Sequence, residues 1–92
     1  MDLEQFHLIA KTVADPARLV ALQMIAKRGE VSCSDLCSRL DLTAATISHH
    51  VKELSATGLV QQRKEGKFLI LSLNLPVWRA YLKELARLVP EE

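Results

Sequence analysis

The spacing of apolar side chains predicts that the chain begins with helices. In residues 3–13 apolar positions recur every three or four residues, which is typical of a short amphipathic helix. Asp15 and Pro16 then provide an N-cap and a proline at the first helical position, so a second helix begins there. Gly29 ends this second helix. Its inward stripe is expected to consist of Leu19, Leu22, Ile25 and Ala26.

Two more helices follow, separated by a short connection. Ser32 with Asp35 three residues later forms a variant capping box that opens a third helix, which ends at about Leu40. Thr43 is the expected cap of a fourth helix that ends before Gly58. The inward side of this fourth helix consists of Ile47, Val51 and Leu54. Two helices joined by so few residues are typical of a helix-turn-helix.

After Gly58 the pattern favours strands. Residues 59–63 and 67–73 are expected to form a hairpin whose turn contains Gly66, because such a turn needs a positive φ. Pro76 opens a last helix that runs to Val89 and carries large apolar side chains on one side. Four helices, a two-stranded hairpin and a closing helix predict a mainly α winged helix-turn-helix. We expect it to form a single domain over residues 1–92.

Composition narrows the class of protein further. A chain of 92 residues, 49% apolar and 25% charged, has a marginal core of its own, which favours a partner subunit. Two cysteines and no signal-peptide pattern exclude a disulfide-rich secreted scaffold. The longest aliphatic and aromatic run, residues 68–71, is far short of the ~20 residues of a membrane span. We therefore expect a cytoplasmic protein without membrane contact. No nucleophile–base pair stands out, so an enzyme is not expected.

The outward side of the fourth helix and the hairpin tip predict contact with double-stranded DNA. A net charge of +1 indicates no partner by itself, so the position of the cations decides. A helix fits the major groove, where hydrogen-bonding side chains contact base edges, while basic side chains neutralise phosphates. The alternative is a solvated helix face beside a polar turn. The candidate DNA-binding residues are Thr43, Ala45, Thr46, Ser48, His49 and Lys52 on the helix, and Arg63, Lys64 and Lys67 on the hairpin.

Three segments together resemble the ArsR/SmtB family. They are residues 14–19 (ADPARL), residues 42–51 (LTAATISHHV), and residues 58–60 with 63–68 (GLV, RKEGKF). The resemblance implies a small dimeric winged-helix repressor, and many members of the family sense metals. It also implies that Ser48 and His49 contact DNA from the recognition helix and that the hairpin cations contact it from the wing. Family members often carry Gln and Ser where this chain has Ala44 and Ala45, so sequence preference is expected to rest more on DNA shape.

Cys33 and Cys37 are the candidate signal-sensing residues. The arsenic-responsive branch of the family carries Cys-x-Cys-x-x-Cys here, whereas residues 32–37 are SCSDLC, so only Cys37 falls on a family ligand position. The last helix has no His or Asp, so the zinc site of the other branch is not expected. Three alternatives stay open. The thiols are structural, or they respond to oxidants, or they bind a soft metal or metalloid with a third ligand from a partner, such as His7 or an acidic group of its first helix.

The first and last helices predict a two-fold homodimer. Their apolar side chains exceed what so small a core covers. A dimer presents two recognition helices about 34–36 Å apart to a pseudo-palindromic operator. We therefore expect a repressor that releases its operator on a signal, the alternative being a winged-helix module that binds proteins and not DNA. The expected interface residues are Leu3, Phe6, Trp78, Tyr81, Leu82, Leu85 and Val89.

Overall fold

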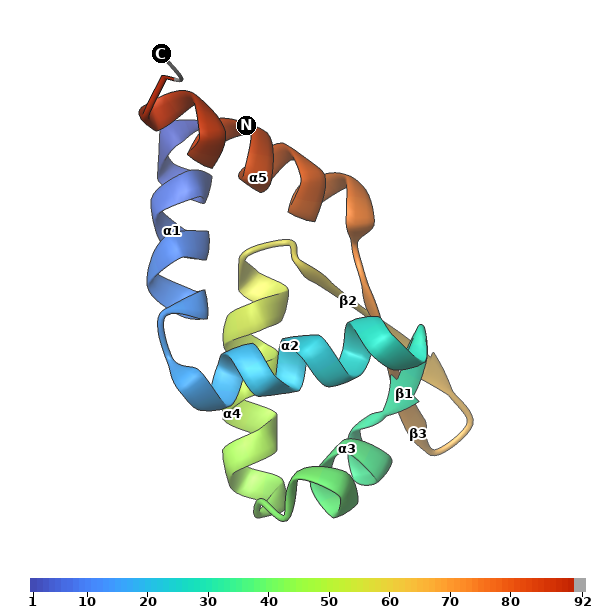
Figure 1. Cartoon of the computed structure of the whole chain (residues 1–92). Helices are drawn as coiled ribbons and strands as arrows, with labels where there is room; N and C mark the ends of the chain where they lie inside the picture. Colours follow the sequence, from blue (N-terminus) through green and yellow to red (C-terminus); the bar gives the residue numbers. More distant parts are fainter. Residues whose placement is uncertain (91–92) are drawn as a thin grey trace.

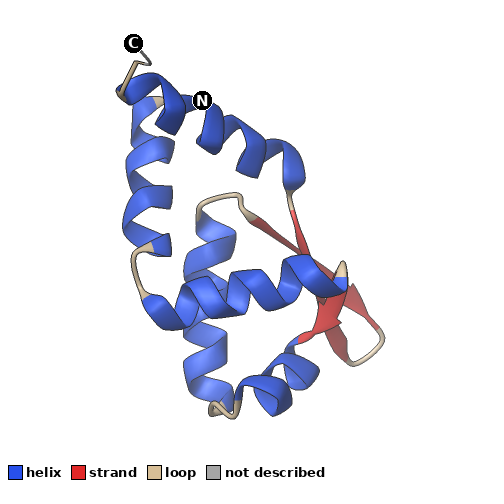
Figure 2. Cartoon of the chain, viewed as in Figure 1, coloured by secondary structure: helices blue, strands red, loops and turns tan. Residues whose placement is uncertain are grey.

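A computed structural model describes residues 1–90, which form five helices and a small sheet (Figures 1 and 2). The molecule is elongated, with extents of 49 × 23 × 22 Å. Helix α5 lies at one end against α1, while α3 and the lower half of α4 lie at the other (Figure 1). In chain order the elements are α1 (Leu3–Val13), α2 (Pro16–Arg28), β1 (Glu30–Ser32), α3 (Cys33–Leu40), α4 (Ala44–Ala56), β2 (Val60–Glu65), β3 (Phe68–Leu73) and α5 (Leu75–Leu88).

The helix starts are capped as the sequence predicts. Asp15 Oδ2 accepts a hydrogen bond from the Arg18 backbone N–H at 2.9 Å, and Thr43 Oγ1 accepts one from Thr46 N–H at 3.2 Å. Ser32 Oγ does the same for Asp35 N–H at 3.1 Å. Each cap satisfies one of the backbone donors that a helix start leaves free. Residues 41–43 join α3 to α4, which confirms the short connection of the helix-turn-helix.

The sheet contains one strand more than predicted. Strand β1 pairs with β3 in antiparallel register, with Val31 opposite Leu71, so the order is β1-β3-β2. Three residues are too few to show an alternating pattern, and their partners lie 38 to 42 positions later in the chain. The hairpin itself is confirmed. Its loop is Gly66-Lys67, and Gly66 has the positive φ of +59° that the turn requires.

The core lies where α2 and α4 pack on each other and on the sheet. Ile47, Val51 and Leu54 are buried on α4 as predicted. On α2 the buried stripe is Ala21, Leu22 and Ile25, whereas Leu19 is 39% exposed and Ala26 is also exposed, so the predicted stripe is wrong at two positions. The inward side of α2 also includes Arg18, which is half-buried. A charged residue on the inward side of a helix escapes a search for apolar spacing, because its alkyl stem is buried while its head stays polar.

Candidate nucleic-acid interface

The outward face of α4 carries short polar and cationic side chains. Ser48, His49 and Lys52 are exposed, and Ala45 beside them adds only a methyl group. The hydroxyl of Thr43 caps the helix and also donates to Thr46 Oγ1 at 2.9 Å, so both threonines are engaged in the start of α4. This face is slim enough to enter a DNA groove, and it offers hydrogen-bonding groups in its first two turns. His50, the next residue along the helix, is buried.

Lys64 and Lys67 of the hairpin have no ion-pair partner within residues 1–90, and neither has Lys52. Lys64 lies opposite Leu69 in the β2–β3 register, so both side chains point to the sheet face that looks toward α4. Lys67 Nζ lies 5.6 Å from the centre of the exposed Phe68 ring. Lys52 on α4 and Lys64 and Lys67 on the neighbouring hairpin are therefore three unpaired lysines, as expected of phosphate contacts.

Arg63, the other predicted hairpin contact, is held by two carboxylates. Its Nη1 donates to Glu30 Oε2 at 2.7 Å and its Nη2 to Glu65 Oε2 at 2.8 Å. The hydrogen bond and positive charge of Arg63 lower the pKa of Glu30, and its bonds to Glu30 and Glu65 raise the pKa of the guanidinium further above its ordinary value. The sequence indicated Glu65 as the one acid beside these cations. Glu30 was missed because β1, which brings it across the sheet, was itself missed.

A further cation, Arg18, lies beside the recognition helix α4, and the sequence pattern did not indicate this position. Arg18 of α2 reaches across to α4, where its Nη2 lies 3.4 Å from His49 Nε2. Its Nε is buried without a hydrogen-bond partner, and no carboxylate within residues 1–90 pairs with its guanidinium. The sequence places Arg18 in the segment that resembles ArsR/SmtB proteins, but only the crossing of α2 over α4 brings it to His49 on α4 (Figure 1).

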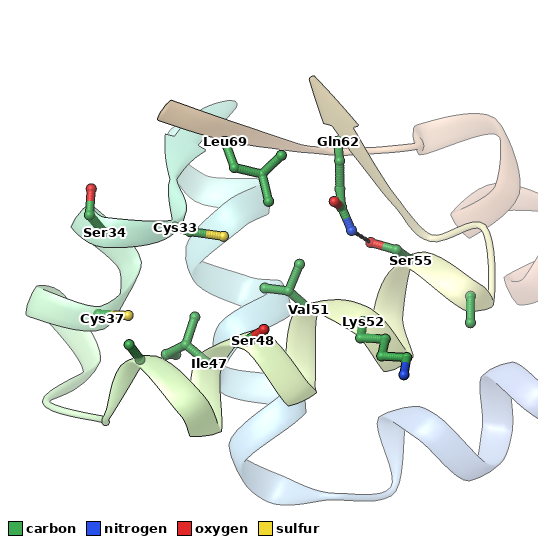
Figure 3. A pocket seen from close by; sticks show the side chains of 12 residues that line it. Cys33, Ser34, Cys37, Ile47, Ser48, Val51, Lys52, Ser55, Gln62 and Leu69 are labelled. Carbon is green, nitrogen blue, oxygen red and sulfur yellow. Dashed lines mark hydrogen bonds between the residues drawn. The ribbon is translucent and has the colours of Figure 1, made fainter. Parts of the chain in front are cut away.

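A groove of about 810 Å³ separates α3, α4 and the hairpin. Figure 3 shows both cysteines of α3 on one side of it and Ile47, Ser48 and Val51 of α4 on the other, while Gln62 donates to Ser55 Oγ at 2.6 Å across one end. Lys52 is its only charged lining residue. The thiols thus share a wall with residues of the recognition helix.

Both thiols are free and half-buried. Burial raises the pKa of Cys33, and the neighbouring Cys37 raises it further, so the neutral thiol is favoured there. Within residues 1–90 no three His, Cys, Asp or Glu side chains gather as metal ligands. His7, the suggested third ligand, lines a different hollow with Phe6, Glu84 and Leu88. Within the described residues, the two thiols therefore lie on the groove wall without a third His, Cys, Asp or Glu side chain gathered beside them.

The predicted dimer residues divide into two sets. Phe6 and Tyr81 are buried inside the single chain, with ring centres 5.4 Å apart, so they hold α1 to α5 rather than offering surface to a partner. Trp78 is half-buried against the same core. The remaining residues of the set stay exposed, at fractions of 70% for Leu3 and 79% for Val89. Together with Leu88, they form an apolar face of α1 and α5 that consists of Leu3, Leu82, Leu85, Leu88 and Val89.

Residues 13–63, more than half of the chain, match the profile of a helix-turn-helix domain family. The arsenical resistance operon repressor of Escherichia coli is 38% identical over 76% of this chain. The transcriptional activator HlyU of Vibrio cholerae is 33% identical over 88% of this chain and 74% of its own length. The chain belongs to the ArsR/SmtB family. It is therefore a winged helix-turn-helix DNA-binding regulator, and its family is one of transcription regulators and not of enzymes.

Solved structures of this ArsR-family fold agree with the chain along nearly its whole length. Reduced HlyU from Vibrio cholerae has a TM-score of 0.73 at 31% identity and covers 96% of this chain and 92% of its own. Mb0332 from Mycobacterium bovis, a homodimeric winged helix-turn-helix domain, has a TM-score of 0.78 at 25% identity. The match covers 97% of this chain and 84% of the Mb0332 chain. The chain spans only 62% of the Escherichia coli repressor. No helix within residues 1–90 is both long and apolar enough to cross a membrane.

Proposed function

We propose that this protein is a homodimeric transcriptional repressor that inserts α4 into the major groove of a pseudo-palindromic operator. The observation that carries the proposal is the exposed face of α4 together with Lys52 on this helix and Lys64 and Lys67 on the neighbouring hairpin, none of them paired within residues 1–90. Ser48 and His49 then meet base edges, and the lysines meet phosphates on either side of the groove.

The dimer is supported by the apolar face of α1 and α5. Its residues, Leu3, Leu82, Leu85, Leu88 and Val89, are exposed on these helices or directly after α5, and α1 and α5 meet at the end of the molecule opposite α3 (Figure 1). Contiguous apolar surface of this kind marks an interface, and a two-fold axis there buries the same face of both copies. Mb0332, of similar fold, is a homodimer. Pairing at α1 and α5 leaves the outward face of α4 uncovered in both copies.

We propose that the releasing signal acts at Cys33 and Cys37. Both thiols line the groove that Ser48 and Lys52 also line, so a group bound or formed on sulfur would occupy space next to the recognition helix. Such a group switches the protein only if it binds the released form more tightly than the DNA-bound form. A soft metalloid ion needs a third donor from the partner subunit, whereas oxidation of the thiols needs none.

The test starts from DNA selected by the wild-type protein out of a random duplex library. Fluorescence anisotropy then compares the wild type with Ser48→Ala and His49→Ala, which should bind the selected duplex at least about tenfold more weakly. The matched control is Ser38→Ala, an exposed serine of α3. If no duplex is enriched, or if the two α4 variants bind as the wild type does, the protein is a winged-helix module for other partners.

The signal is tested with the same duplex. Arsenite, or hydrogen peroxide in a separate titration, should release it from the reduced wild type and not from the Cys33→Ser, Cys37→Ser double variant. Release by arsenite alone assigns the signal to a soft ion, and release by peroxide alone assigns it to oxidation. If the double variant is released just as the wild type is, the thiols are structural.

A further inference from the structure

The side chains of Arg18 on α2 and His49 on α4 are in contact. Arg18 Nη2 lies 3.4 Å from His49 Nε2, and this is the only hydrogen bond of either side chain within residues 1–90. A guanidinium stays protonated and has donors only. The bond therefore forms only when Nε2 carries a lone pair, that is, when His49 is neutral with its proton on Nδ1.

The position of Arg18 is built into the fold. Its backbone N–H belongs to the Asp15 cap, and its side chain lies on the inward stripe of α2 beside Ala21 and Leu22. The buried Nε shows that the stem is packed against the protein, which leaves Nη2 to reach α4. Since no carboxylate holds the guanidinium elsewhere within residues 1–90, its hydrogen bond to His49 has no competitor in the protein.

The tautomer decides which bases His49 can recognise. With the proton on Nδ1, the free side of the ring is a donor, which suits the acceptors guanine N7 and O6, adenine N7 and thymine O4. With the proton on Nε2, the free nitrogen is an acceptor, which suits the amino groups of adenine and cytosine. Fixing the tautomer therefore fixes the polarity of this contact.

We propose that Arg18 is a positioning residue that sets the tautomer of His49 and thereby restricts the base that His49 contacts. The inference rests on the proposed function, since it assumes that His49 faces the major groove. Arg18 acts through His49 and does not itself select the base.

The first test observes the tautomer in the protein without DNA. Long-range ¹H–¹⁵N NMR spectra at about pH 8, where imidazole is ordinarily neutral, distinguish the two ring nitrogens of His49. We expect the Nδ1–H form in the wild type and in Arg18→Lys, which keeps a cationic donor. We expect its loss in Arg18→Met, which keeps an unbranched stem in place of the arginine stem and removes the guanidinium. Arg28→Met removes an exposed arginine from the end of α2 and should leave the spectrum unchanged. A wild-type spectrum with the proton on Nε2 would overturn the proposal.

The second test measures base preference with the selected duplex and its single-base variants. Arg18→Met should reduce discrimination at one position of each half-site by about fivefold to tenfold, the scale of one lost base contact. In a His49→Ala background the same substitution should change nothing there. If Arg18→Met weakens binding to every duplex equally, Arg18 is a phosphate contact and the inference is wrong, while the proposed function stands. If the wild type enriches no duplex, the proposed function fails first, and the NMR result still decides the tautomer.

Discussion

The ion pairs of Arg63 lead to a prediction about how strongly salt weakens DNA binding. Glu30 and Glu65 hold the guanidinium at 2.7 and 2.8 Å, so in the free protein it is neutralised by carboxylates and not available to phosphate. Replacing both acids in the variant Glu30→Gln, Glu65→Gln removes this competition and leaves the hairpin otherwise the same size. We expect the freed Arg63 to become a phosphate contact.

The size of the effect follows from the number of cations. Lys52, Lys64 and Lys67, each present twice in a dimer, predict a slope of log K against log [salt] of about −5 for the wild type. Two additional Arg63 contacts steepen it to about −7. Between about 50 and 200 mM salt, affinity should thus fall about 10³-fold for the wild type and about 10⁴-fold for the variant. At low salt the variant should bind more tightly than the wild type.

Fluorescence anisotropy titrations at several salt concentrations measure both slopes. Adding Arg63→Gln to the double variant should restore a slope of about −5, which shows that Arg63 supplies the extra contact. Glu84→Gln is the control, because it breaks the exposed Arg87–Glu84 pair on α5 and removes a negative charge away from the hairpin. The reasoning is refuted if the double variant and the wild type have the same slope. In that case Arg63 either lies out of reach of phosphate or leaves its carboxylates whenever DNA binds.

Three other predictions address the interface, the thiols and the core. Leu85→Glu places a charge on the apolar face of α1 and α5. It should therefore convert the dimer to a monomer in analytical ultracentrifugation and weaken operator binding roughly 10²-fold. A variant that stays dimeric would contradict the proposed interface. Burial raises the pKa of the Cys33 thiol. Its alkylation by iodoacetamide, followed by mass spectrometry, should therefore be slow at neutral pH and accelerate as the pH rises past the ordinary thiol range. An alkylation rate already at its plateau near pH 7 would contradict the raised pKa. Leu54→Ala empties a fully buried site and should lower the free energy of unfolding by about 2–5 kcal/mol in urea titrations at fixed protein concentration. Val20→Ala on α2, where the side chain is 47% exposed and lies outside the proposed interface, should cost far less; equal losses would contradict the assignment of the core.

The fold was predictable from the sequence because its signals are local. Caps such as Asp15 and Thr43 act on residues three positions away, and apolar stripes such as Ile47, Val51 and Leu54 repeat within one helix. Gly66 indicates the hairpin turn in the same local way, because the loop needs a positive φ, which residues other than glycine rarely adopt. These interactions appear in any window of about a dozen residues, and they suffice for the helices, the hairpin and the outward face of α4.

Only the tertiary structure decided which side chains from distant parts of the chain contact each other. Glu30 meets Arg63 across 33 positions of sequence, and Arg18 meets His49 across 31. Phe6 and Tyr81, two residues predicted for the dimer interface, are instead buried against each other within one chain. None of these contacts produces a periodic pattern in the sequence, because each depends on how two helices or strands are placed relative to each other. The sequence by itself determined which side of α4 faces outward. Only the packing of α2 on α4 decided how His49 is held, and only the pairing of β1 with β3 decided that Glu30 neutralises Arg63.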